Sequence, residues 1–213
     1  MLGLRRAHLG PLAVLLSVLI PFSVYFGYRR NYEFLLYLGV IVFFLVVIAL
    51  TNGRVRYPLS ILWGLVAWAI LHLCGGGIQI GDGVLYGVIL VPLSDKVPIF
   101  RYDQFVHIIG FGVATLLMYH LLGPLLRPDF RHWTALSIVV TMAGLGVGAL
   151  NEIVEFMATL LMPETGVGGY INTALDLVAD LVGAVLAVVF LRFGYFRPAS
   201  PVLPAKSRNS GGL

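Results

Sequence analysis

The stretch WTALSIVVTMAGLGVGALNEIVEFMATL, residues 133–160, decides the fold of this chain. It is longer than the roughly 20 apolar residues that a helix needs to cross a membrane. It nevertheless contains Asn151, Glu152 and Glu155. A carboxylate at the centre of a membrane helix is disfavoured by roughly 2.5 to 3.5 kcal/mol, so it persists for binding, catalysis, transport or mutual pairing.

The composition places the whole chain in the same class. Of its 213 residues, 59% are apolar and 11% are charged, whereas a soluble domain carries about a quarter charged residues. We therefore predict an all-α fold, a polytopic membrane helical bundle. A single cysteine, Cys74, excludes an intrachain disulfide. Because the basic residues are scattered in short loops, the net charge of +4 indicates topology and lipid contact and argues against nucleic-acid binding.

About six apolar runs are long enough to be transmembrane helices. They lie at residues 9–28, 34–50, 58–73, 103–122, 133–160 and 171–192. We expect residues 1–197 to form a single transmembrane domain. The segment 198–213 is rich in Pro, Ser and Gly, which is typical of a disordered tail.

The distribution of Lys and Arg predicts the orientation. Six spans put both termini on one side of the membrane, and ten basic residues share that side: Arg5, Arg6, Arg54, Arg56, Arg127, Arg131, Arg192, Arg197, Lys206 and Arg208. The other side has four: Arg29, Arg30, Lys96 and Arg101. The positive-inside rule then predicts cytoplasmic N and C termini in a multi-pass protein.

The longest connection, residues 74–101, is rich in glycine and joins the third and fourth spans on the extracytoplasmic side. It is too apolar for a solvated loop, although Asp95 within it is expected to be solvated. We predict a short hairpin or a re-entrant cap, with its backbone covered by protein. Its glycines lack the Lys and Ser/Thr of a phosphate-binding P-loop, so a role in tight turns is favoured.

Four of the spans bring polar residues to the same outer depth. The third ends at His72, and the fourth begins with Tyr102 and Asp103, followed by His107 one turn deeper. The fifth and sixth supply the rest: Asn151, Glu152, Glu155, Thr173, Asp176 and Asp180. Their spacings of three or four residues put each acidic pair, and Asp103 with His107, on one helical face. Small residues on these faces would let the helices approach closely.

Five carboxyls in one pocket cannot all be ionised beside His107 and Arg101 alone. Either some are protonated or a cation compensates. The cofactor we consider is a divalent metal ion, held by a subset of the acidic side chains and the imidazole: His107, Glu152, Glu155, Asp176 and Asp180. A substrate would meet the neutral polar residues His72, Tyr102, Asn151 and Thr173. The alternative is a structural network, with single polar groups satisfied at the interface.

The chain resembles the VanZ-like membrane proteins and, more closely, the uncharacterised inner-membrane proteins of the YjdF type. The segments that carry the resemblance are LHLCGGG (71–77), RYDQFVHIIGF (101–111), NEIVEF (151–156) and GYINTALDLVADLVGA (169–184). It departs from these patterns at Phe156, where YjdF-like proteins tend to have Trp, and at Asp180, where VanZ-like proteins tend to have Asn. The resemblance implies a helical bundle in the cytoplasmic membrane of a prokaryote and points toward the cell envelope.

Three functions are open. The first is an enzyme or binding protein for a lipid or lipid-linked envelope substrate at the outer leaflet. In it, Asp103 and His107 act in acid–base chemistry or ligation, Glu152 and Glu155 act as bases or ligands, and the two aspartates of the last span complete the site. The second is proton- or ion-coupled transport, although no charged relay continues through the inner half of the last three spans. The third is a non-catalytic assembly or envelope-stress protein. The sequence leaves the oligomeric state open.

The orientation can be tested with reporter fusions. A cytoplasmic type of reporter should be active after Ser207, and an extracytoplasmic type should be active within residues 74–101, because ten basic residues lie on the predicted cytoplasmic side and four on the other. An extracytoplasmic signal after Ser207 would put the polar residues at the inner leaflet and contradict the prediction.

Overall fold

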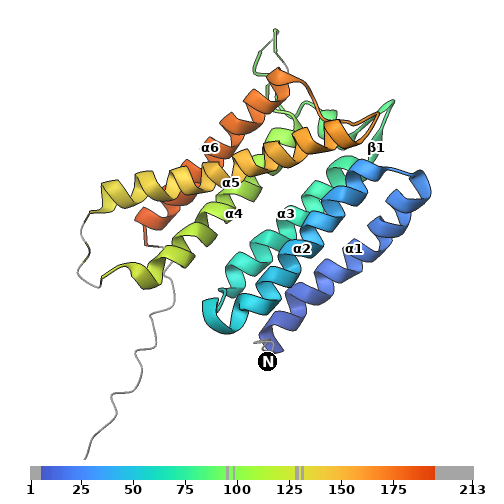
Figure 1. Cartoon of the computed structure of the whole chain (residues 1–213). Coiled ribbons are helices and arrows are strands. Elements are labelled where there is room, and N and C mark those ends of the chain that lie inside the picture. The colour runs from blue at the N-terminus through green and yellow to red at the C-terminus, as the bar shows by residue number, and fades with distance from the viewer. Residues whose placement is uncertain (1–5, 95, 98, 128–129, 131, 195–213) are drawn as a thin grey trace, which may run out of the picture.

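The computed structural model describes residues 6–94, 96–97, 99–127, 130 and 132–194. Asp95 and the tail at 198–213, for which solvation and disorder are predicted, lie outside these residues (Figure 1).

Six long helices make up most of the described chain. They are α1 Leu9–Arg29, α2 Tyr32–Val55, α3 Leu59–Gly77, α4 Tyr102–Leu122, α5 Trp133–Leu161 and α6 Tyr170–Arg192. Three short 3-10 turns accompany them: η1 Arg6–His8, η2 Leu85–Gly87 and η3 Gly123–Leu125. In the described part of the chain, six helical segments are long and apolar enough to cross a membrane. The predicted fold class is confirmed.

The helix ends agree with prediction except on α2 and α3, which run further. α2 continues to Val55 because Asn52 and Gly53 do not break it, and it ends where Arg56 adopts a left-handed φ of 54°. α3 begins after Pro58, whose extended backbone caps the helix, and it continues through Gly77.

The helices form two groups of three that meet where α3 packs on α4 (Figure 1). The core of the first group is built from α1, α2 and α3, with Phe26, Phe34 and Leu73 among its buried side chains. A second core joins α3 to the other group, with Ile61 on α3 and Val140 on α5. α4 contacts α3, α5 and α6 and is therefore the element on which the second group is assembled.

The connection between α3 and α4 begins with a hairpin, as predicted. Strand β1 Gln79–Ile80 pairs antiparallel with β2 Gly83–Val84, and Gly81 between them has a φ of 57° that suits glycine. An isolated bridge pairs Ile89 with Arg101. The hairpin thus returns the chain to the start of α4.

The prediction of turns at Gly75, Gly76 and Gly77 is wrong, because all three belong to α3. A side chain on any of them would overlap an aromatic ring: Tyr86 at Gly75, Phe34 at Gly76 and Phe22 at Gly77. These glycines provide flat surfaces for aromatic packing, which local spacing does not distinguish from a turn.

Small residues allow α4 and α6 to approach closely, as their positions predict. A methyl group on Gly183 would overlap the carbonyl oxygen of Ile108 and lie 3.0 Å from the backbone nitrogen of Gly112. Gly148 on α5 packs against the carboxylate of Asp180 in the same way. Gly110, by contrast, lies against Trp68 of α3. The backbone atoms next to Gly183 cannot move aside for an added methyl group as a flexible side chain could.

Replacing Gly183 by alanine should therefore separate α4 from α6. We expect Gly183→Ala to lower the free energy of unfolding by about 1 to 3 kcal/mol, which is the usual cost of overpacking. Gly146→Ala is the matched control, since nothing lies within 4 Å of a side chain there. It should gain up to about 1 kcal/mol of helix propensity. Equal thermal stability of the two variants in detergent would contradict the close approach.

Candidate functional site

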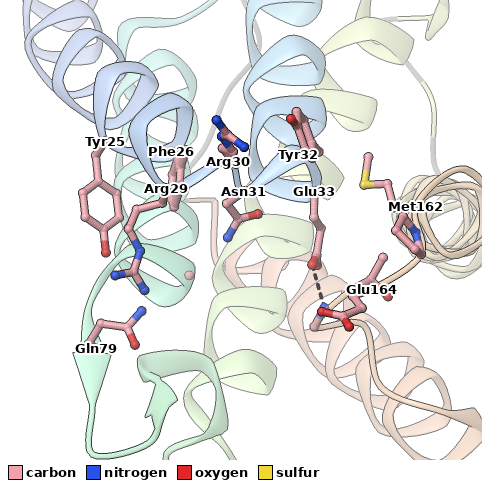
Figure 2. Close-up of a pocket in the computed structure, with 14 residues that line it drawn as sticks. Tyr25, Phe26, Arg29, Arg30, Asn31, Tyr32, Glu33, Gln79, Met162 and Glu164 are labelled. Atoms are coloured by element: carbon pink, nitrogen blue, oxygen red, sulfur yellow. Dashed lines mark hydrogen bonds between the residues drawn. The ribbon is translucent and has the colours of Figure 1, made fainter.

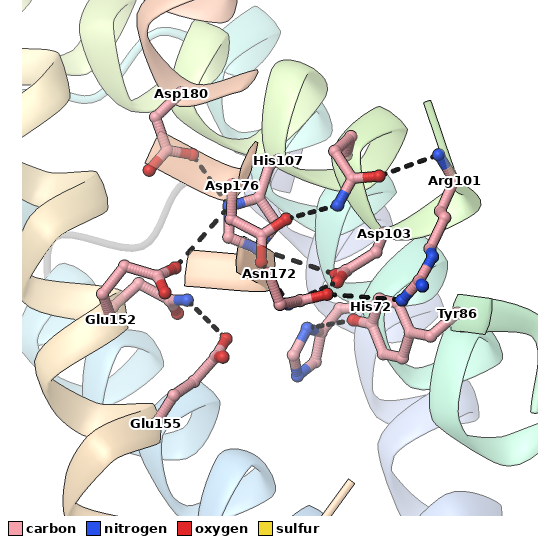
Figure 3. Close-up of polar contacts among 12 residues, drawn as sticks. His72, Tyr86, Arg101, Asp103, His107, Glu152, Glu155, Asn172, Asp176 and Asp180 are labelled. Carbon is pink, nitrogen blue, oxygen red and sulfur yellow. Dashed lines mark hydrogen bonds and ion pairs between the residues drawn. The ribbon is translucent and has the colours of Figure 1, made fainter. Parts of the chain in front are cut away.

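His107, one turn into α4, is the centre of the polar cluster (Figure 3). Its Nδ1 atom lies 2.8 Å from Oδ1 of Asp180 on α6, and both side chains are buried. Its Nε2 atom lies 3.8 Å from Oδ1 of Asp103, four residues earlier on the same helix. Because Asp180 engages Nδ1 and fixes the ring, Nε2 is the atom left to act on a ligand.

Two glutamates of α5 also lie near the imidazole. Oε1 of Glu152 lies 4.0 Å from Nδ1 of His107. Glu152 is 8% exposed, and neither of its carboxylate oxygens has a hydrogen-bond partner among the described residues. Thr173 and Asn151 are the polar side chains near this carboxylate. Glu155 accepts a 2.8 Å hydrogen bond from the Asn151 amide.

Asp176 of α6 is wholly buried and is held by two amides. Nε2 of Gln104 donates to its Oδ1 atom over 2.6 Å, and Nδ2 of Asn172 donates to its Oδ2 atom. The same Asn172 amide reaches Oδ2 of Asp103 over 3.2 Å. Gln104 also accepts a hydrogen bond from the backbone N–H of Arg101, which closes the first turn of α4.

A cavity of about 380 Å³ opens onto this cluster, and we call it the main cavity. Its lining includes Asp103, His107 and Glu155, with the side chain of Arg101 at one edge. Nε of Arg101 is buried without a hydrogen-bond partner among the described residues, although its NH1 group lies 3.5 Å from Oδ1 of Asn172. A guanidinium and several carboxyls therefore face the same space.

Aromatic and imidazole groups form the wall nearest the hairpin. His72 lines the main cavity, and its Nδ1 atom is hydrogen-bonded to the hydroxyl of Tyr86. Burial raises the pKa of Tyr86, so its hydroxyl keeps its proton at neutral pH. Tyr86 also lies against Gly75, which places the η2 turn that follows the hairpin against the end of α3.

The structure brings the six predicted acidic and imidazole residues together but separates three of the four neutral ones from the main cavity. The Tyr102 hydroxyl donates to the carbonyl of Leu71 and ties α4 to α3. Asn151 positions Glu155. Thr173 stands near Glu152. Among the four, only His72 lines the cavity.

Sequence reasoning missed several residues of the site. Asn172 could have been found, because it stands four residues before Asp176 on the same face. Gln104 bonds Asp176 across the helix interface, and Glu33 and Tyr37 of α2 reach the cavity only through tertiary packing. No local spacing predicts such contacts.

Two sets of side chains lie close enough together to hold a metal ion. One is Asp103, His107 and Asp176, and the other is His107, Glu152 and Glu155. Within each set, one potential ligand atom per residue lies within 4.8 Å of the others. Carboxylate oxygens with one imidazole suit divalent ions such as Mn²⁺.

The chain matches a family model described as "Predicted membrane protein (DUF2238)" over residues 11–196. It therefore belongs to this family, and it is a membrane protein. The family description carries neither the VanZ-like nor the YjdF-type name. No curated protein and no solved structure matches the chain.

The hydrogen bond between Gln104 and Asp176 can be tested by exchanging the amide and the carboxylate between the two positions. Gln104→Glu places two carboxylates against each other in a buried position and should lower the free energy of unfolding by about 2 to 4 kcal/mol. Adding Asp176→Asn restores a donor opposite an acceptor and should recover most of the loss. Gln79→Glu, on the exposed strand β1, is the control. Failure of the double variant to recover thermal stability would contradict the assigned bond.

Proposed function

We propose that this member of the DUF2238 family binds a divalent cation at the wall of the main cavity and, with it, the anionic headgroup of a lipid or lipid-linked cell-envelope substrate. The observation that carries the proposal is the orientation of His107. Asp180 engages its Nδ1 atom at 2.8 Å, so Nε2 is available beside Asp103.

The imidazole and its buried carboxylate resemble the arrangement found around metal-binding histidines, in which a second carboxylate orients the ring and raises its basicity. In this proposal Asp103, His107 and Asp176 are the ligands, and Asp180 is the orienting carboxylate. Glu152 supports the proposal because its buried carboxylate lacks a hydrogen-bonding donor among the described residues. A nearby cation would offset its charge.

Arg101 is the reason for proposing an anionic headgroup. Its guanidinium lines the same cavity as Asp103 and His107. Arginine binds phosphate and carboxylate groups in a planar, two-point geometry, and a metal ion on the opposite wall would neutralise the remaining charge. Glu155 also lines the cavity and is our candidate for the general base, with Asn151 holding one of its oxygens.

The distribution of basic residues supports an outer-leaflet location in a prokaryotic cytoplasmic membrane, with both termini inside. The transport alternative is less well supported. The acidic residues of α4, α5 and α6 all lie in the halves of these helices nearer the hairpin, with Asp180 at the middle of α6, and the other halves carry no acidic residue that could continue a relay. We propose no second function.

Cation binding can be measured with Mn²⁺ on the purified full chain in detergent. We expect the signal of free Mn²⁺ in electron paramagnetic resonance to fall on adding protein. The melting temperature should rise, since a ligand at a hundred times its Kd adds about 2.7 kcal/mol to stability. Asp103→Asn should weaken binding at least about tenfold, because it removes one charged ligand.

Asp82→Asn is the matched control for this experiment. Asp82 is an exposed carboxylate in the hairpin turn and does not line the main cavity. Its removal should leave Mn²⁺ binding unchanged. Wild-type protein that neither removes free Mn²⁺ nor gains thermal stability with it would refute the cation site and leave the cluster as a packing network.

A further inference from the structure

A second cavity, of about 530 Å³, lies where the turn between α1 and α2 meets strand β1 and the segment after α5 (Figure 2). We call it the outer cavity. Its charged and polar lining comes from three parts of the chain: Arg29, Arg30, Glu33, Gln79 and Glu164. Figure 2 shows the side chain of Arg29 extending toward Gln79.

Of the four described basic residues at the hairpin end of the bundle, three line the two cavities. Four Lys and Arg residues stand at this end, namely Arg29, Arg30, Lys96 and Arg101. The first two line the outer cavity and the last lines the main cavity. Positive charge is scarce on this side of the membrane, and these three arginines line cavities that also carry carboxylates, so each is placed where it can contact a bound anion.

Neither arginine of the outer cavity forms an ion pair with a described residue, although the carboxylates of Glu33 and Glu164 line the same cavity. Among the described residues, the ion pairs all involve His107, and none reaches Arg29 or Arg30. The nearby carboxylate of Glu33 is already engaged. It accepts hydrogen bonds from the Tyr37 hydroxyl at 3.3 Å and from the backbone N–H of Gly166 at 2.6 Å.

Glu33 and Gly166 line both cavities, so their contact stands at the boundary between the two. The contact joins the first turn of α2 to the segment between α5 and α6. A molecule with one group at Arg29 and another beside His107 would pass along this contact. The cavities are therefore neighbouring parts of one binding region.

We propose that the outer cavity binds the phosphate of a phospholipid headgroup, with Arg29 as the principal ligand. Arg29 is the last residue of α1, at the depth where a membrane-spanning helix meets the headgroups. The inference rests on the function proposed above, since it assigns the substrate class of the same site. The part of the lipid next to its phosphate then reaches the main cavity.

The test uses the purified full chain and soluble dihexanoyl phosphatidylglycerol as the probe, with binding followed by thermal stability and thermophoresis. Wild-type protein should bind the lipid, and Arg29→Gln should weaken binding at least about tenfold, because a charge-assisted, two-point contact is lost. Arg29→Lys should fall between them, because it keeps the charge and loses the planar geometry. Arg54→Gln, an exposed arginine at the opposite end, is the control and should bind as wild type does.

Two further probes identify the source of the phosphate. Dihexanoyl glycerol, which lacks the phosphate, should not respond to Arg29→Gln. Inorganic phosphate should bind far more weakly than the lipid. Equal binding of inorganic phosphate and the lipid, or equal lipid binding by wild type and Arg29→Gln, would overturn the proposal.

Mn²⁺ binding separates this inference from the function on which it rests. Arg29→Gln should keep the wild-type Mn²⁺ affinity, because Arg29 does not line the main cavity. If wild-type protein binds no Mn²⁺ but its lipid binding depends on Arg29, the cation site fails and the phosphate site stands. If Mn²⁺ binds and Arg29→Gln leaves lipid binding unchanged, the phosphate site fails and the cation site stands.

Discussion

A charged side chain between membrane-spanning helices must be paired with another group of the protein, because lipid offers it no hydrogen bonds. Removing one partner of such a buried pair costs about 3 to 5 kcal/mol. The pair of His107 and Asp180 meets this constraint between α4 and α6. It forms beside the place where Gly183 brings the two backbones together. The packing of the second helix group and the assembly of the polar cluster therefore have a common origin.

Much of this arrangement can be predicted from the sequence, because hydrophobic length sets the spans and helical spacing sets their faces. Asp103 with His107, and Asp176 with Asp180, lie on shared faces for that reason. Depth follows from topology, so the convergence of α4, α5 and α6 is also predictable. The sequence does not predict whether the cluster serves function or packing, since both uses need the same residues at the same spacing.

What the sequence does not predict depends on side chains that meet across elements distant in the chain. Glu33 directly precedes the apolar run of α2. Its carboxylate nevertheless accepts a hydrogen bond from the backbone of Gly166, which is distant in the sequence. Gly76 looks like part of a turn until the Phe34 ring is placed against it. Contacts of this kind depend on the relative rotation of helices, which neither hydropathy nor a motif specifies.

Gln104 has two bonding partners with different roles. It closes the first turn of α4 through the backbone of Arg101, and it holds Asp176 across the helix interface. The end of the helix cannot fray while that carboxylate stays in place, and the carboxylate cannot reorient while the turn stays closed. The amide proton of Arg101 therefore exchanges with solvent only when the site opens, and its rate of exchange reports the cooperativity of that opening.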